Sequence, residues 1–200
     1  MTVIPIKPNE RINLSGAEVL LADGNPQGLQ VLTEMFAGFG VHTPHLCSGA
    51  ETAMEVVKNR ELNLLVIDSG LPDSDGFELV TWLRRSGLQP NSLAPVILLA
   101  GHTKTSDICK GRDCGANFVV RKPCPPMVMM QRILWITKEA RPFVESNGYC
   151  GPDRRFRAMG PPAGSKGRRH DDLSIELGAA TEPNLDQTDI DALFSPRKAM

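Results

Sequence analysis

Three charged residues stand where apolar stretches of the sequence end, and their types suit the chemistry of metals and phosphate. Asp23 follows the stretch 17–22, Asp68 closes the stretch 64–68, and Lys122 follows the stretch 117–121. Two neighbouring carboxylates repel each other unless a cation lies between them, and Mg²⁺ binds through one or two carboxylates while keeping several waters. A lysine beside them would offset the charge of an incoming phosphoryl group, and an aspartate in that setting can attack phosphorus and form an acyl phosphate.

Taken singly, each of these residues has a simpler interpretation, because aspartates often cap loops and a lysine often neutralises them. The secondary-structure elements that carry these residues decide between a metal and phosphate site and this simpler interpretation. Apolar runs lie at residues 17–22, 41–46, 64–68, 95–100 and 117–121. Helical spacing lies between and after them, at residues 26–39, from residue 48 onward, and at 75–85, 105–114 and 125–137. This alternation is typical of a parallel sheet with helices on both faces.

We therefore predict an α/β fold, a doubly wound five-stranded parallel sheet followed by a disordered tail. Ligands of such sheets bind beyond the carboxyl ends of the strands, and Asp23, Asp68 and Lys122 would meet there. The run 41–46 contains Pro44 and is expected to be an edge strand.

The sequence also predicts where two of the helices begin or end. Ser48 and Glu51 predict a capping box, and Gly115 is expected to end the helix 105–114.

Composition limits the classes of function. The chain has 200 residues, 41% hydrophobic and 5% aromatic residues and a net charge of −1, so it has no bulk attraction to nucleic acid or membranes. It contains no apolar run of the roughly 20 residues that span a bilayer and no signal peptide pattern at its start, so we expect a cytoplasmic protein. The five cysteines are scattered without a CxxC pair and are expected to be thiols, neither a disulfide framework nor a zinc site.

The character of the sequence changes after about residue 145. Residues 151–170 carry six Lys and Arg against one acid, and residues 171–191 carry seven acids and no Lys or Arg. Opposite charge blocks without apolar periodicity are typical of a mobile tail. We predict an N-terminal extension at 1–14, one domain at 15–145, and a largely disordered tail at 146–200 with an amphipathic segment near 185–195.

Four motifs in order resemble the receiver domains of two-component response regulators, the CheY-like family, over roughly residues 15–140. They are VLLADGN, LLVIDSGLPDSDGFEL, PVILLAGH and GANFVVRKP. The resemblance implies that Asp68 is the phosphoacceptor, that Asp23, Asp68 and the carbonyl of Gly70 bind Mg²⁺, and that Lys122 contacts the phosphate. It implies a histidine kinase or phosphotransfer protein as partner. It implies no enzyme activity beyond autophosphorylation and dephosphorylation at Asp68.

The sequence departs from the family pattern at three positions. The first of the usual pair of acids is Ala22, the switch hydroxyl is replaced by Ala100, and the switch aromatic falls on Val119. Phe118 is one place off and would face the opposite side of the sheet. We expect weaker Mg²⁺ binding, and a phosphorylation whose usual conformational output is uncoupled.

Two tail segments carry weaker resemblances. LDQTDIDALF is similar to the N-terminal LSQ-x-EIDALL segment of the flagellar-motor switch protein, so the tail could bind another receiver or a motility or cell-cycle protein, or fold back on its own chain. The stretch YCGPDRRFR, with Arg154, Arg155 and Arg157 beside Phe156, is similar in composition to arginine-rich extensions that bind cyclic di-GMP. A solvated linker is the other interpretation.

The leading hypothesis is a stand-alone, atypical response regulator that acts through protein contacts. No helix-turn-helix pattern follows the receiver-like part, so we expect no DNA binding. The alternatives are a phosphorylation-independent effector that binds a cyclic dinucleotide through residues 154–157, and a scaffold whose tail recruits a partner.

Overall fold

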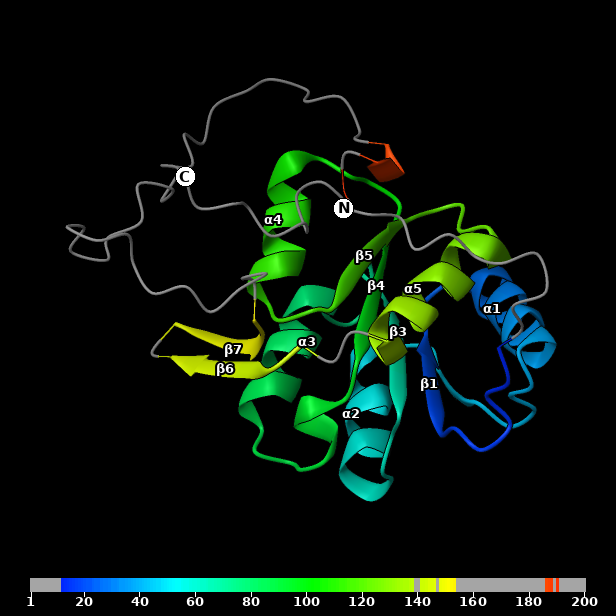
Figure 1. The fold of residues 1–200 in the computed structure, drawn as a ribbon, viewed down its shortest axis with the longest axis horizontal. Coiled ribbons are helices and arrows are strands. Elements are labelled where there is room, and N and C mark those ends of the chain that lie inside the picture. The colour runs from blue at the N-terminus through cyan, green and yellow to red at the C-terminus, as the bar shows by residue number, and fades with distance from the viewer. Residues whose placement is uncertain (1–11, 139–140, 147, 154–185, 189, 191–200) are drawn as a thin grey trace.

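The computed structural model of the chain describes residues 12–138, 141–146, 148–153, 186–188 and 190. Its centre is a parallel sheet with the strand order β2-β1-β3-β4-β5 (Figure 1). The strands are β1 Val19–Ala22, β2 His45–Cys47, β3 Leu64–Asp68, β4 Val96–Ala100 and β5 Phe118–Arg121. The predicted α/β sheet is therefore confirmed. The strand after Pro44 does lie at an edge, although it is shorter than predicted and begins at His45.

Helices cover both faces of the sheet. They are α1 Pro26–Gly38, α2 Ala50–Asn59, α3 Gly76–Arg85, α4 Thr105–Asp113 and α5 Pro126–Lys138, with a short 3-10 helix η1 at Asn91–Leu93. One core cluster joins the sheet to α2, α3 and α4, and the other joins it to α1 and α5. Along β4, Leu98 and Ala100 belong to the first cluster and Ile97 and Leu99 to the second. Strands buried on both faces explain why their sequences are uniformly apolar.

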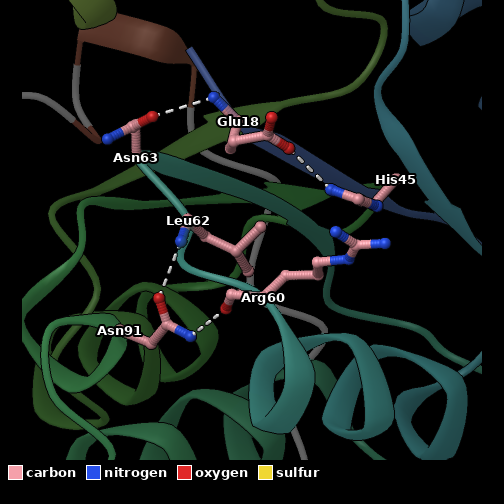
Figure 2. Close-up of polar contacts among 6 residues, drawn as sticks. All are labelled: Glu18, His45, Arg60, Leu62, Asn63 and Asn91. Carbon is pink, nitrogen blue, oxygen red and sulfur yellow. Dashed lines mark hydrogen bonds and ion pairs between the residues drawn. The ribbon is translucent and has the colours of Figure 1, made fainter.

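Polar contacts at the amino end of the sheet hold its strands in register (Figure 2). The backbone N–H of Glu18 donates to Asn63 Oδ1 at 2.8 Å, and the Glu18 carboxylate lies 2.8 Å from His45 Nε2. Below them, the side chain of Asn91 accepts a 2.8 Å hydrogen bond from the N–H of Leu62. These contacts connect the amino ends of β1, β2 and β3 and the segment that contains η1.

The start of α2 corrects one prediction. Its N-cap residue is Gly49, which makes no side-chain capping bond. The carboxylate of Asp73, from the loop between β3 and α3, accepts from the N–H groups of Ala50 at 2.7 Å and Glu51 at 2.9 Å. The predicted capping box at Ser48 and Glu51 is thus wrong, because Asp73, distant in sequence, accepts from the Glu51 N–H that the Ser48 side chain would have satisfied.

The predicted end of the helix 105–114 is confirmed. Cys114 is the C-cap of α4, and Gly115 follows with φ +95°, the left-handed conformation that favours glycine. A Cβ at residue 115 would also collide with the carbonyl oxygen of Cys150. Gly115 therefore both ends α4 and allows a later segment to approach closely.

That later segment is a hairpin that the sequence analysis did not anticipate. The antiparallel strands β6 Phe143–Ser146 and β7 Tyr149–Pro152 lie on the α3 side of the domain (Figure 1). Beneath them Arg84, only 3% exposed, donates to the backbone oxygens of residues 92, 94 and 115. Its guanidinium lies 4.9 Å from the ring centre of Phe143, and burial lowers the pKa of Arg84 to about 10. The hairpin extends the folded part past residue 145, where we expected the domain to end.

The cysteines and helices show no unusual feature. All five cysteines are free thiols, and burial raises the pKa of Cys47 to about 11 and that of Cys114 to about 12. None of the helices within the described residues is both long and apolar enough to span a bilayer.

Candidate functional site

The carboxyl edge of the sheet brings together the three residues singled out in the sequence. Asp23 follows β1, Asp68 is the last residue of the neighbouring strand β3, and Lys122 follows β5. Lys122 is separated from Asp68 by β4, which ends in the small residue Ala100. The backbone N–H of Lys122 donates to Ala100 O at 2.8 Å. Its side chain reaches across the end of β4 from this anchored position.

The ammonium group of Lys122 bridges both carboxylates. Its Nζ lies 2.7 Å from Asp23 Oδ2 and 3.0 Å from Asp68 Oδ1. The Asp23 side chain is only 1% exposed, so its charge needs a nearby partner. Burial of the ammonium acts to lower the pKa of Lys122, but hydrogen bonds to Asp23 and Asp68 and their negative charges outweigh it, and the pKa is raised. The lysine thus supplies the positive charge that keeps two close carboxylates together.

The backbone around Asp23 holds its carboxylate in place. Asp23 Oδ1 accepts from the N–H of Asn25 at 2.8 Å, and Asn25 in turn caps α1 by accepting from the N–H of Gln27. Gly28, in the first turn of α1, lies directly against the Asp23 carboxylate, and a Cβ at that position would collide with Oδ2. A side chain at residue 28 would therefore displace the Asp23 carboxylate from this position.

The loop after Asp68 returns closely on the strand end. Gly70 and Asp75 form an isolated antiparallel bridge, and the Asp75 side chain caps α3 by accepting from the N–H of Phe77 at 2.9 Å. A Cβ on Gly76 would collide with the carbonyl oxygen of Asp68. The Asp-Gly pair in the sequence is explained by these two requirements, a helix cap and a close approach to β3.

The donor set fits a hard divalent cation that retains water. Asp23 and Asp68 provide two carboxylates, and Gly70 faces Asp68 Oδ2, which would lie 3.9 Å from a Cβ at residue 70. Within the described residues, no group of three or more His, Cys, Asp and Glu gathers in one place. Two carboxylates agree with the way proteins hold Mg²⁺, which leaves its other positions to water, phosphate or a backbone carbonyl. Residue 22, a fully buried alanine, adds no oxygen.

The positions that depart from the family pattern lie in the core. Ala100 and Val119 belong to the cluster on the α4 face, whereas Phe118 belongs to the opposite cluster, 5.0 Å from the ring of Trp135. The prediction that Phe118 faces away from Val119 is confirmed. Gly111 of α4 lies so close to Val119 that a Cβ on Gly111 would collide with it. The helix α4 therefore packs tightly over this part of β5.

Two residues from the far end of the chain lie against β5, and the sequence pointed to only one of them, Ile190, through the amphipathic pattern of its segment. Gln187 forms hydrogen bonds with the backbone of β5, and Ile190 is fully buried. They belong to the segment DQTDIDALF, whose amphipathic pattern was the available signal. The arginines at 154, 155 and 157 lie outside the described residues.

Comparisons with known proteins agree with this architecture. The family model described as the response regulator receiver domain matches residues 19–134. The chain is 26% identical to the transcriptional regulatory protein GltR of Pseudomonas aeruginosa, over 68% of this chain and 55% of GltR. It is 28% identical to the DNA-binding response regulator MtrA of Mycolicibacterium smegmatis, over 58% of this chain and 48% of MtrA. The chain spans about half the length of these curated relatives.

Solved structures show the same fold. A putative response regulator from Chloroflexus aurantiacus superposes with a TM-score of 0.57 at 23% identity, covering 62% of this chain and 98% of that one. The chemotaxis response regulator CheY4 of Vibrio cholerae superposes with a TM-score of 0.55 at 19% identity, covering 60% of this chain and 98% of that one.

Proposed function

Since the chain belongs to the family of response regulator receiver domains, we propose that it works in two-component signalling with Asp68 as the residue that accepts the phosphoryl group. The observation that carries the proposal is the position of Lys122 Nζ between the carboxylates of Asp23 and Asp68. A cation held there offsets the charge that a phosphoryl group would bring to Asp68. The protein is a signalling protein, and its own chemistry is limited to phosphorylation and dephosphorylation of Asp68.

The phosphoryl donor is a phosphohistidine of a kinase or phosphotransfer protein. Lys122 holds Oδ1 of Asp68, so Oδ2, on the side of Gly70, is the oxygen that attacks phosphorus. The new O–P bond forms as the P–N bond of the donor breaks, and the electron pair of that bond remains on the imidazole nitrogen, which takes up a proton. Asp23, Asp68 and the carbonyl of Gly70 are the groups that would hold Mg²⁺, which supplies further positive charge to the phosphoryl oxygens when bound.

The output of the phosphorylation passes through protein contacts. A switch needs different contacts in its two states, and Ala100 and Val119 offer neither a hydroxyl nor an aromatic ring for the relay that the family uses. The amphipathic segment near 185–195 is the part of the tail we propose for contacts with another receiver or with a motility or cell-cycle protein. The relative MtrA is a DNA-binding response regulator, whereas the output proposed for this chain is contact with other proteins.

Binding of a cyclic dinucleotide through residues 154–157 remains the alternative function. Calorimetry with cyclic di-GMP, on the native chain and on an Arg154→Ala/Arg155→Ala variant, tests it. Heat of binding that disappears in the double variant would support a phosphorylation-independent effector, and equal heats or none would dismiss it.

Beryllofluoride with Mg²⁺ tests the proposed phosphoacceptor, because it mimics an aspartyl phosphate without a kinase. We expect changes in the NMR amide signals around Asp68 and Lys122 in the native chain and in an Asp113→Asn control, whose side chain is 54% exposed. Asp68→Asn should show no such changes. Identical spectra for the native chain with and without beryllofluoride would contradict the proposal.

A further inference from the structure

The outer edge of β5 is covered by a residue from the far end of the chain. β5 is the last strand in the sheet order. The N–H of Lys122 points toward β4, where it donates to Ala100 O at 2.8 Å. Backbone groups alternate in direction along a strand, so those of Val119 and Arg121 point away from β4. Edge groups of this kind are the ones that another chain can pair with.

A single side-chain amide pairs with both of these outward groups. Oε1 of Gln187 accepts from the N–H of Arg121 at 3.0 Å, and Nε2 of Gln187 donates to the carbonyl of Val119 at 3.4 Å. An amide group has the same donor and acceptor as a peptide bond. Gln187 thus occupies the place of one residue of an added strand.

An aliphatic side chain follows at the spacing of one helical turn. The N–H of Ile190 donates to the carbonyl of Asp186 at 3.1 Å, which closes the turn. Ile190 is 0% exposed and belongs to the same core cluster as Ala100, Ile108 and Val119. The segment, red in Figure 1, lies at the β5 end of the sheet. Ile190, nearly seventy positions beyond β5, is therefore part of the receiver core. An incidental contact of the chain terminus would not bury a side chain in this way.

We propose that the edge of β5 beside α4 is covered in cis by Gln187 and Ile190 of this chain, a side-chain amide and, three residues later, an aliphatic side chain, and that this cover blocks the face to other proteins. Because the segment is covalently attached, its docking is independent of protein concentration. A protein partner that uses this face must displace the chain's own segment. The proposal does not depend on phosphorylation of Asp68, so either can fail without the other.

Hydrogen exchange of the Arg121 amide in the full chain, measured by NMR, tests the docking. Gln187→Ala and Ile190→Ser should each make this amide exchange about two- to tenfold faster, the range expected for loss of one hydrogen bond. Thr188→Ala is the control, since Thr188 is exposed in the same turn. The amide of Lys122, bonded within the sheet, should keep its rate in every variant. Unchanged exchange at Arg121 in both variants, or equal acceleration at Arg121 and Lys122, would overturn the proposal.

Two further measurements test whether the segment that covers β5 belongs to the same chain and whether its sequence pattern is required. Protection of Arg121 in the native chain should be the same at low and high protein concentration, whereas protection that rises with concentration would show exchange between copies and overturn the docking in cis. A synthetic peptide of residues 184–194, added to the Ile190→Ser chain, should restore slow exchange at Arg121. The same peptide with Gln187→Ala should not restore it. Failure of the unaltered peptide would contradict a surface that accepts this pattern.

Discussion

Lys122 Nζ lies 3.0 Å from Asp68 Oδ1, although the strands that end beside these residues are separated by β4. The same nitrogen lies 2.7 Å from Asp23 Oδ2. The ammonium of Lys122, at the end of β5, therefore pairs with the carboxylates of residues 23 and 68 at the ends of β1 and β3. The stability of the fold and the chemistry proposed for Asp68 therefore depend on the same ammonium group.

Removal of this ammonium should destabilise the folded chain. In Lys122→Met the buried carboxylate of Asp23 loses its partner, and we expect the free energy of unfolding to fall by about 1–3 kcal/mol, less than for a fully buried pair because Lys122 is 29% exposed. Urea unfolding measures the loss. Mg²⁺ should recover part of it by supplying positive charge between the carboxylates. A variant as stable as the native chain would refute the role of the ammonium.

The contribution of Lys122 should also depend on pH. Its pKa is raised in the folded chain, since hydrogen bonds to Asp23 and Asp68 outweigh burial, which acts to lower it. A raised folded pKa contributes stability that is complete below the unfolded value, about 10.4, and is lost as the pH rises through the folded value. The difference in unfolding free energy between native chain and Lys122→Met should be constant up to about pH 10 and shrink above it. A difference that shrinks toward acid within the neutral range would contradict this assignment.

Two glycines in the same helix should respond differently to alanine. A Cβ on Gly28 would collide with Asp23 Oδ2, whereas a Cβ on Gly38 meets nothing within 4 Å. We expect Gly28→Ala to destabilise the chain and to weaken chemistry at Asp68. Gly38→Ala should be neutral or stabilise by up to about 1 kcal/mol through helix propensity. Thermal unfolding of both variants checks the pair, and equal effects would argue against the tight fit at Asp23.

Asp73 should control the start of α2. Its carboxylate accepts from the N–H groups of Glu51 and Ala50, and these hydrogen bonds lower the pKa of Asp73. In Asp73→Ala the two amides should exchange faster, while amides in the middle of α2 keep their rates. Equal exchange rates of these two amides in the native chain and the variant would contradict this role, because water would then replace the carboxylate without loss of protection.

Arg84 should anchor the hairpin to the domain, because its guanidinium lies 4.9 Å from the ring centre of Phe143 in β6. It donates to three backbone oxygens while buried, so Arg84→Met leaves buried acceptors without a donor and should cost at least about 2 kcal/mol of stability. Arg85→Met is the matched control, since Arg85 is the exposed next residue of α3. Denaturant unfolding measures both. Amides of β6 and β7 should lose protection in the Arg84 variant alone.

Much of the site could be predicted because its residues lie at strand ends. Once the apolar runs are taken as parallel strands, Asp23, Asp68 and Lys122 must lie at one edge of the sheet. The same reasoning placed Phe118 and Val119 on opposite faces, since direction alternates along a strand. The hydrophobic periodicity that predicts each strand is a local property of the sequence, so it can be recognised without knowledge of tertiary contacts.

Contacts between distant segments could not be predicted in the same way. The capping box at Ser48 and Glu51 failed because Asp73 reaches the N–H of Glu51 through the tertiary fold. The pairing of Gln187 with β5 joins residues more than sixty positions apart. The amphipathic pattern of the segment that contains Gln187 does not specify where this segment binds. The hairpin depends on Arg84 and on the close approach at Gly115, which become visible only when α3 and β7 are placed together.

Intact-mass measurement after incubation with acetyl phosphate and Mg²⁺ tests directly whether Asp68 accepts a phosphoryl group. We expect the native chain to gain the mass of one phosphoryl group, and the gain to disappear when a strong chelator is added before the reaction. Asp68→Asn should gain nothing, while Asp113→Asn should behave as the native chain. A native chain that remains unmodified, or an Asp68→Asn variant that gains the same mass, would contradict the assignment of Asp68 as the phosphoacceptor.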